Sequence, residues 1–420
     1  MTKPSPMAVA PVLQGGRWVV LVLLGCRTPL RSEEPTPEPE PVVTAGPRVA
    51  AAAADLSAIA AWTQPRVPTG ATVTGLPDLS AQTCAGCHDA IHAEWAASTH
   101  NRAWVDPQFQ AELHKDPSVA WLCINCHTPM ADQQPRLVAA PSVLRDPPSQ
   151  VNPAFDPSLQ AEGITCAACH WRPGGIAAVH EDAVAPHALV FDGTLRDPAL
   201  CMSCHQAMAA VEPTLVCHFD TGSEWLAANP GRTCQDCHMP AVERPVAAGG
   251  PTRTVARHLW PGSLLAKTPL TDLQRSYFAD WEPGVGLSLD APSTTVPGAA
   301  GTATAWVSHE RAGHRVPTGD PERHLMVRVT ATDSAGVVLA TAEERIGQTW
   351  EWWPVATLLG DNRLSPGDRR AVPVAFEVPA DGGVRVEAVV EHVRISDENA
   401  AFHALGDYPR RREVARASWP

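Results

Sequence analysis

Cys84-Ala85-Gly86-Cys87-His88 is the first of five copies of the pattern that decides the fold of this chain. In each copy two cysteines stand three positions apart, and a histidine follows the second cysteine directly. The copies are Cys84/Cys87/His88, Cys123/Cys126/His127, Cys166/Cys169/His170, Cys201/Cys204/His205 and Cys234/Cys237/His238. Because they contain ten of the twelve cysteines, the cysteines of this chain form a repeat and are not scattered.

The spacing within each copy has a chemical reason. Two thiols three positions apart lie on one side of a helical turn and can form thioethers with the two vinyl groups of a haem, while the next histidine reaches the iron. Zinc and disulfides are the alternatives, but five pairs do not group evenly into four-cysteine sites, and zinc needs no histidine after every second cysteine. The pattern therefore predicts five covalently bound haem c groups, with the motif histidines as iron ligands.

The five motifs are so close in the sequence that the haems they attach must lie close together in space. His88 and His238 are 150 residues apart in the chain, and a globule of that length has a radius of gyration of about 15 Å. Five porphyrins in that space lie close enough to conduct electrons. Their apolar faces also replace ordinary core side chains, which explains why only 5% of the residues are aromatic.

The length of the chain indicates the number of domains, and its net charge disfavours one class of partner. The chain has 420 residues, enough for two or three domains. Its net charge of -13 disfavours a nucleic-acid-binding surface.

The first residues read as an export signal. An apolar run at residues 18–24 follows Lys3 and Arg17, and it is too short to span a bilayer as a helix. The sequence Leu23-Leu24-Gly25-Cys26 also resembles the lipobox of bacterial lipoproteins, which implies a lipid anchor on Cys26. An ordinary cleaved signal is the alternative. We expect a location in the periplasm or at the cell surface, attached to a bacterial membrane.

The rest of the chain divides by composition. We expect a signal peptide over residues 1–25, a Pro/Glu/Ala-rich tether over 26–78 with a loose helix near 49–62, and a pentahaem domain of short helices over 79–282. Residues 283–420 contain alternating apolar runs, which predict a small antiparallel, immunoglobulin-like β-sandwich and a solvated basic tail. The predicted runs are 302–307, 325–329, 337–340, 372–376 and 384–390. The expected class is a multidomain α+β fold.

The residues around the motifs resemble those of a known group of proteins. Cys84 to His88 with Trp95-Ala-Ala-Ser-Thr-His100 resembles the opening of bacterial multihaem cytochromes c that carry electrons from hydroxylamine oxidation. The segments 163–170, 185–187, 224–225 and 234–240 look like those of a wider group of bacterial multihaem cytochromes, and 313–319 looks like part of that group's C-terminal domain. The resemblance implies electron transfer. The departure is the number of motifs, since five matches neither a four-haem carrier nor an eight-haem oxidoreductase.

A six-coordinate haem needs a second axial ligand, which in such chains is usually histidine. The best candidates by position are His100, His187, His258 and His314, the last of which would bring the β-region onto the haems. The fifth distal ligand stays unassigned. Weaker candidates are His92, His114, His180 and His218, and we expect Cys217 to be a quiet free thiol. The histidines expected to face solvent are His309, His324, His392 and His403.

Three functions can be compared for a protein with a haem array of this kind. The favoured one is an electron carrier, not a catalyst, whose partners are redox proteins such as other cytochromes or a membrane complex that oxidises quinol. The alternative is an oxidoreductase that acts on a small nitrogen or sulfur species at one open haem. A structural or sensory lipoprotein would make no use of closely spaced haems. The Cys-x-x-Cys-Lys motif of nitrite reductases is absent from the sequence, and Tyr277 and Tyr408 are poor candidates for a haem crosslink.

Overall fold

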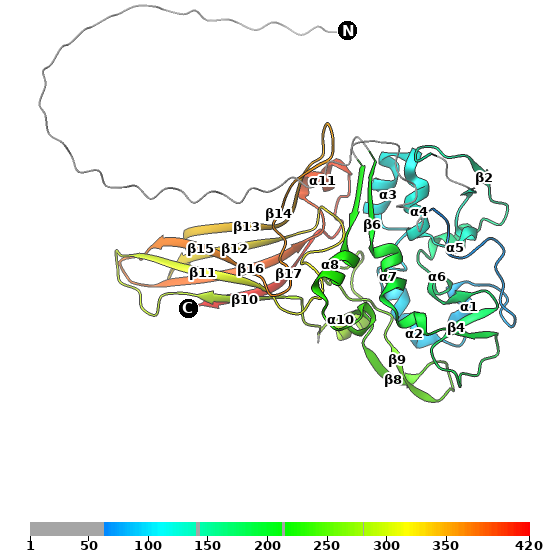
Figure 1. Ribbon diagram of the computed structural model, residues 1–420. Helices are drawn as coiled ribbons and strands as arrows, with labels where there is room; N and C mark the ends of the chain where they lie inside the picture. Colours follow the sequence, from blue (N-terminus) through cyan, green and yellow to red (C-terminus); the bar gives the residue numbers. More distant parts are fainter. Residues whose placement is uncertain (1–62, 140–142, 212–214, 280) are drawn as a thin grey trace, which may run out of the picture. The chain divides into compact units, whose positions relative to one another are not determined.

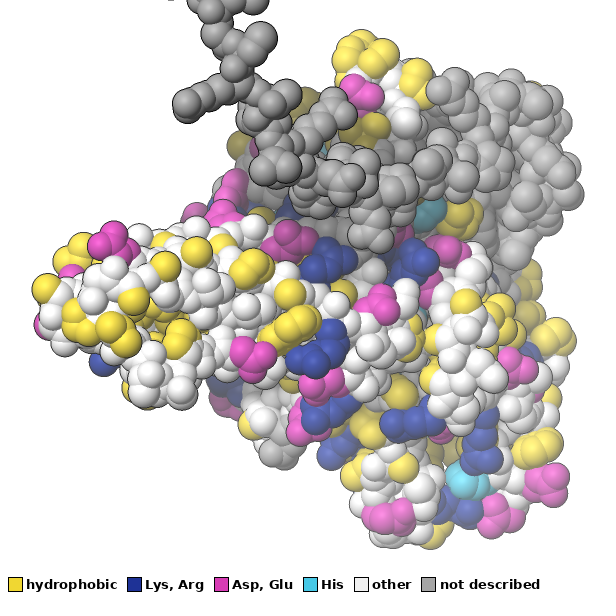
Figure 2. Space-filling view, turned by 60° about the vertical axis from the view of Figure 1, so that its left-hand side comes forward, with side chains coloured by type: hydrophobic (Ala, Val, Ile, Leu, Met, Phe, Trp, Pro, Cys, Tyr) yellow, Lys and Arg dark blue, Asp and Glu magenta, His cyan; other side chains and the backbone are white. Residues whose placement is uncertain are grey.

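The computed structural model describes residues 63–139, 143–211, 215–279 and 281–420. The predicted signal peptide, Cys26 and the alanine-rich segment 49–62 lie outside the described residues. Within the described part of the chain, no helix is both long enough and apolar enough to cross a membrane. Figure 2 shows basic and acidic side chains interspersed over the face in view, with no broad patch of one sign.

The motifs lie on short helices, as the sequence predicts. The helices and 3-10 turns are α1 (Ala81–Ala85), α2 (Asp89–Ala97), α3 (Pro107–Lys115), η2 (Pro117–Val119), α4 (Ala120–His127), η3 (Ala131–Gln133), α5 (Pro157–Ala161), α6 (Cys166–His170), η4 (Gly193–Arg196), α7 (Pro198–His205), α8 (Thr221–Ala228), α9 (Cys234–His238), α10 (Asp272–Ala279) and α11 (Asp397–Phe402). The helices α4, α6, α7 and α9 each end at a motif histidine. A helical turn therefore places the two thiols of these motifs on one side and delivers the histidine at its end.

Capping side chains start several of these helices. The Oγ atom of Ser80 accepts a hydrogen bond from the backbone N–H of Thr83 at 3.1 Å, at the start of α1. Before α9, Thr233 and Asp236 cap each other's backbone N–H groups. Such caps satisfy N–H groups that a short helix leaves without partners, so they compensate for the small number of internal hydrogen bonds.

Small sheets that the sequence did not predict connect the motif helices. Their strands are β1 (Arg136–Val138), β2 (Ser149–Val151), β3 (Trp171–Arg172), β4 (Gly175–Ala178), β5 (Leu189–Phe191), β6 (Ala207–Val211), β7 (Leu215–Phe219), β8 (Ala241–Pro245) and β9 (Thr252–Ala256). The strand orders are β1-β2, β3-β4-β5, β6-β7 and β8-β9. All pairs are antiparallel except β4 with β5.

A small apolar cluster supports the first and third motifs. It contains Val67, Val73, Leu79, Met130 and Ala167, all buried. The chain therefore packs from residue 63 onward, whereas the sequence placed residues up to 78 in an extended tether. The signal missed was a pair of apolar residues within a Pro- and Gly-rich stretch.

The C-terminal part of the chain forms two antiparallel sheets. Its strands are β10 (Val285–Asp290), β11 (Ala300–His309), β12 (His324–Asp333), β13 (Val338–Glu351), β14 (Thr357–Asp361), β15 (Arg369–Glu377), β16 (Val384–Val393) and β17 (Arg411–Trp419). One sheet has the order β10-β11-β15 and the other β14-β13-β12-β16-β17. Figure 1 shows these strands lying side by side.

One core joins the two sheets. Strand β11 contributes Ala303 and Ala305, and β12 contributes Val327 and Val329, each with no exposed surface. Burial at every second position is the pattern of a strand with one face on a core. Helices and sheets together give the α+β class that the sequence predicted.

Three expectations for this part of the chain need correction. The basic tail is not a free end, because β17 pairs with β16 from Arg411 opposite Val393 to Trp419 opposite Val386. Strands β10 and β14 were also missed. The four histidines expected to face solvent are instead enclosed: 5 to 7% of the surface is exposed for His309, His324 and His392, and 5% of the side chain for His403.

Candidate functional site

A single large cavity brings all five motifs together. Its volume is about 2920 Å³, compared with about 300–1,000 Å³ for an ordinary small-molecule pocket. All ten motif cysteines and all five motif histidines line it, together with His100, His187, His258 and His314. The cavity therefore has the size and the lining for an array of large groups.

The motifs touch one another in a definite pattern. Three pairs of thiols from different motifs lie close enough to shift each other's pKa: Cys84 with Cys166, Cys126 with Cys204, and Cys201 with Cys234. The first motif is thus next to the third, and the fourth is next to the second and the fifth.

Arg66 links the third motif to the fourth. Its Nε atom donates to the carbonyl oxygen of Ala168 at 3.0 Å, and its Nη1 atom donates to the Oγ atom of Ser203. The fourth motif is therefore the junction of the array, with neighbours in the second, third and fifth.

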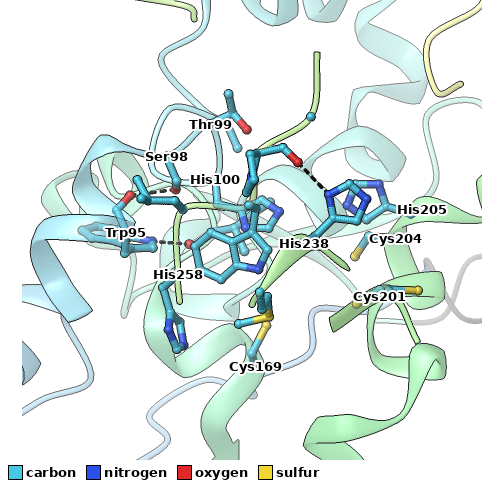
Figure 3. A pocket seen from close by; sticks show the side chains of 18 of the residues that line it. Trp95, Ser98, Thr99, His100, Cys169, Cys201, Cys204, His205, His238 and His258 are labelled. Atoms are coloured by element: carbon cyan, nitrogen blue, oxygen red, sulfur yellow. Dashed lines mark hydrogen bonds between the residues drawn. The ribbon is translucent and has the colours of Figure 1, made fainter. Parts of the chain in front are cut away.

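Four motif histidines face a second histidine across a gap. The distances between ring centres are 6.5 Å for His88 and His187, 6.3 Å for His205 and His100, 6.2 Å for His170 and His258, and 6.3 Å for His238 and His314. The four distal candidates from the sequence are thus the ones that the structure brings opposite motif histidines. Figure 3 shows four of these eight rings, those of His100, His205, His238 and His258, around one part of the cavity.

These separations fit a metal ion between the rings. A metal–imidazole bond is about 2 Å long. Two such bonds in line, plus about 1 Å from each nitrogen to its ring centre, put two axial imidazoles about 6 Å apart. The observed 6.2 to 6.5 Å agrees with this value, so the residues present fit iron held by two histidines and a porphyrin attached through the neighbouring thiols.

Backbone carbonyls fix the orientation of most of these rings. The Nδ1 atom contacts a carbonyl oxygen at 2.6 to 3.3 Å in His127 and in six of the eight paired rings, which are His88, His170, His187, His238, His258 and His314. A carbonyl oxygen only accepts, so Nδ1 carries the proton and the lone pair is on Nε2. This is the tautomer that binds a metal through Nε2.

Burial keeps the imidazoles neutral. It lowers the pKa of His100 to about 3 and those of His205, His258 and His314 to about 4, with smaller contributions from neighbouring histidines and cations. At pH 7 these rings are unprotonated, as a metal ligand must be.

The second motif differs from the other four. The ring of Phe109 stacks on His127 with centres 3.6 Å apart and planes 6° apart. Among the described residues, no histidine ring is paired with His127. The carbonyl oxygen of Ala103 holds its Nδ1 at 2.8 Å, so the lone pair is on Nε2, as in His88, His170 and His238. The fifth distal ligand, which the sequence left unassigned, is therefore not a histidine at the spacing of the other four.

The remaining candidates have other surroundings. His92 lies against Trp95, and His218 lies against Trp350. The Nδ1 atom of His114 contacts the carbonyl oxygen of Gln110 in its own helix. Burial raises the pKa of Cys217 to about 12, so this thiol stays protonated.

A buried carboxylate that the sequence did not single out holds the loop of His258. Glu94, in α2, is 1% exposed. Its two oxygens accept from Arg244 at 2.8 Å each, from Arg257 at 2.8 Å and from the backbone N–H of His258 at 2.8 Å. Glu94 thereby fixes the backbone that carries the His258 imidazole.

A second buried carboxylate holds the loop of His314. Glu224, in α8, accepts from Arg363 at 2.6 Å and from the Oγ1 atom of Thr318 at 2.7 Å. His309 supports the same loop, because its Nε2 atom donates to the carbonyl oxygen of His314 at 2.7 Å. Glu224 lies in the segment 224–225 that carries the resemblance, but the sequence assigned it no role, whereas His309 continues the alternation of Ala303, Ala305 and Val307.

Known structures show the fold. The chain aligns with the crystal structure of a penta-haem cytochrome c552 from Thermochromatium tepidum at a TM-score of 0.57 and 20% sequence identity, over 81% of this chain and 98% of that chain. No protein-family model and no curated protein matches the sequence. The chain thus has a fold similar to that of a multihaem cytochrome.

Two β-glucuronidase structures overlap only with part of the chain. One, from Bacteroides uniformis, covers 26% of this chain and 12% of its own at a TM-score of 0.16 and 17% identity. The other, from glycoside hydrolase family 2, covers 30% and 10% at a TM-score of 0.15 and 9% identity. Overlaps this small carry no functional argument.

Proposed function

We propose that this chain is an exported, membrane-anchored pentahaem c-type cytochrome that transfers electrons through closely packed haems. The observation that carries the proposal is the set of four histidine pairs at 6.2 to 6.5 Å in one cavity with five Cys-x-x-Cys-His motifs. Haem iron bound in this way supplies one-electron redox chemistry. It needs no open coordination position, which suits a carrier.

The chain's own residues have three tasks in this proposal. The ten motif thiols attach the haems, His88, His127, His170, His205 and His238 are the proximal ligands, and His187, His100, His258 and His314 are the distal ligands of four of them. Backbone carbonyls orient the rings, and Glu94 and Glu224 hold two of the distal loops. The part that contains the motifs is a haem-organised domain, followed by a C-terminal sandwich that docks through His314.

The anchor and the location follow from the sequence alone. We propose that Cys26 carries the lipid, that the segment after it tethers the protein to a bacterial membrane, and that the protein lies in the periplasm or at the cell surface. Its partners are then redox proteins at the same membrane, and nucleic acid is not among them.

The contact pattern of the motifs provides a test. Serine at both Cys201 and Cys204 removes the fourth attachment, at the junction, and serine at both Cys84 and Cys87 removes the first, at an end. Each variant keeps four haems. If the array conducts, the fourth-motif variant slows electron exchange among the remaining haems far more than the matched first-motif variant, as measured by stopped-flow reduction. Equal effects, or wild-type protein with three or fewer irons per chain, would reject the proposal.

One observation favours a second function, an oxidoreductase acting on a small nitrogen or sulfur species. His127 has Phe109 against its ring and no paired histidine among the described residues. A haem there can keep one axial position for an external ligand. Carbon monoxide binding to the reduced wild-type protein at one haem supports this function, and its absence favours a carrier alone.

A further inference from the structure

A cluster of three basic side chains, one buried and two partly buried, lines the cavity where the two parts of the chain meet. Lys267 precedes α10, Arg323 lies just before β12, and Arg394 follows β16. Their charges act on one another: Arg394 and Arg323 lower the pKa of Lys267, and Arg394 lowers that of Arg323, in addition to the larger effect of burial on both. Three cations this close need compensating negative charge.

Two of the three cations have partners. Lys267 forms an ion pair with Asp106. Arg394 donates to the Oη atom of Tyr408 at 2.8 Å and to the carbonyl oxygen of Leu265. Tyr408 in turn donates to Asp106 at 2.8 Å, so Lys267, Asp106, Tyr408 and Arg394 form one connected network.

Arg323 has no such partner. Its Nε atom is fully buried and makes no hydrogen bond, and among the described residues no carboxylate lies within 4 Å of its guanidinium. Burial lowers the pKa of Arg323 although the charge of Asp320, in the same loop, opposes this effect, and Asp320 accepts the backbone N–H of Glu322 at 2.9 Å instead of a hydrogen bond from Arg323. A guanidinium without a hydrogen-bonded anion inside a protein is unfavourable, and an anion that binds to it relieves this.

The place of Arg323 indicates where that anion lies. Arg323 lines the large cavity and is not fully enclosed by protein atoms. A Cβ atom on Gly319, whose φ is +90°, would stand 3.2 Å from the Nη1 atom of Arg323. Gly319 thus leaves room for a guanidinium that faces the cavity.

We propose that Arg323 is an oxyanion-binding residue in this cavity. Its ligand is a carboxylate or a small planar oxyanion, which a guanidinium binds through two parallel hydrogen bonds. The carboxylate can come from a propionate of one of the haems, or the oxyanion can be a free molecule such as nitrite. This inference rests on the proposed haem array.

Arg323→Gln tests the proposal in the mature protein, with Arg328→Gln as the matched control. Arg328 lies on β12 with half of its side chain exposed and pairs with Glu343 at 2.7 Å. The iron-to-chain ratio is measured first. A low ratio in the wild type refutes the haem array itself. If the ratio is five, but the variant changes neither a midpoint potential nor the binding of nitrite, only the role of Arg323 is refuted.

The two sources of the anion give different results. If a propionate binds, Arg323→Gln moves the midpoint potential of one haem to lower values, because a lost cation disfavours the reduced form, and added nitrite changes nothing. If a free oxyanion binds, the wild type binds nitrite in calorimetry and in its visible spectrum, and Arg323→Gln weakens this about tenfold or more.

A conservative variant guards against misfolding. Arg323→Lys keeps the charge and loses the planar pair of donors, so it should give a smaller change in the same direction. The proposal would be overturned if Arg323→Gln and Arg323→Lys both kept the midpoint potentials of the wild type and if neither the wild type nor the variants bound nitrite. An equal change in Arg328→Gln would also overturn it.

Discussion

The imidazoles of His238 and His314 lie parallel, with ring centres 6.3 Å apart and planes 10° apart, although they are 76 positions apart in the chain. His238 ends α9, and His314 lies in the loop between β11 and β12. The C-terminal sheets are therefore joined to the motif-bearing part by a ring that faces a predicted iron site. Ligand binding that requires this arrangement also stabilises it.

His314→Ala should convert one haem from low to high spin. The thioethers keep the haem in place while the iron loses one axial imidazole. We expect a new carbon-monoxide-binding haem and a lower thermal midpoint, because the two parts lose a shared ligand. His180→Ala is the control, since its ring has no motif histidine opposite. Unchanged spin states in His314→Ala would show that the sheets dock without contributing a ligand.

Glu94→Gln should destabilise the protein by about 3 kcal/mol, because it leaves two partly buried arginines without their buried anion. The backbone N–H of His258 also loses its charged acceptor, so the low-spin signal of the third haem should broaden or shift. Guanidinium unfolding and electron paramagnetic resonance measure the two effects. Glu243→Gln is the control, since Glu243 is exposed and accepts only from Thr254. A loss of stability no greater than that of the control would contradict the role assigned to Glu94.

Glu322 predicts a dependence of stability on pH. Burial, with smaller contributions from Asp320 and Glu112, raises its pKa from 4.5 to about 8. Between about pH 4.5 and pH 8 the folded protein then keeps a proton at Glu322 that the unfolded chain releases, so the contribution of Glu322 to stability falls as the pH rises through this window. Glu322→Gln should raise the thermal midpoint at pH 8 more than at pH 5. An equal change at both values, as expected for the exposed control Glu343→Gln, would show that the pKa is not raised.

Cys26→Ser should release the protein from membranes without loss of haem. The proposed anchor and the haem attachment use different cysteines, and the anchor precedes the packed part of the chain. Membrane fractionation and mass spectrometry of the N-terminal peptide measure the outcome. Wild-type protein that is free of lipid would reject the anchor and leave the haem array unaffected.

The sequence predicted the motif sites because their chemistry is local. Two thiols and a histidine within five residues need only one helical turn, and four of the motif helices end at the histidine. The sequence also indicated five strands, since alternation along β11, β12 and β16 is clear. It did not indicate β17, where charged residues such as Arg411 and Glu413 hide the alternation.

The pairing of the rings could not be predicted. His100 is twelve residues from His88, yet its ring faces His205, because the partner of a distal ligand depends on tertiary packing. The buried carboxylates that hold the loops of two distal histidines could not be predicted either. The sequence assigned no role to Glu94 or Glu224, and only the fold shows that arginines from distant segments reach them.

Electron paramagnetic resonance of the oxidised, fully loaded protein tests the central claim most directly, when combined with an iron-to-chain ratio. Four histidine pairs and one motif histidine against Phe109 predict five haems per chain, four of them low-spin with two axial imidazoles and one distinct from them. Fewer than four such low-spin haems, or five identical ones, would contradict the site described above.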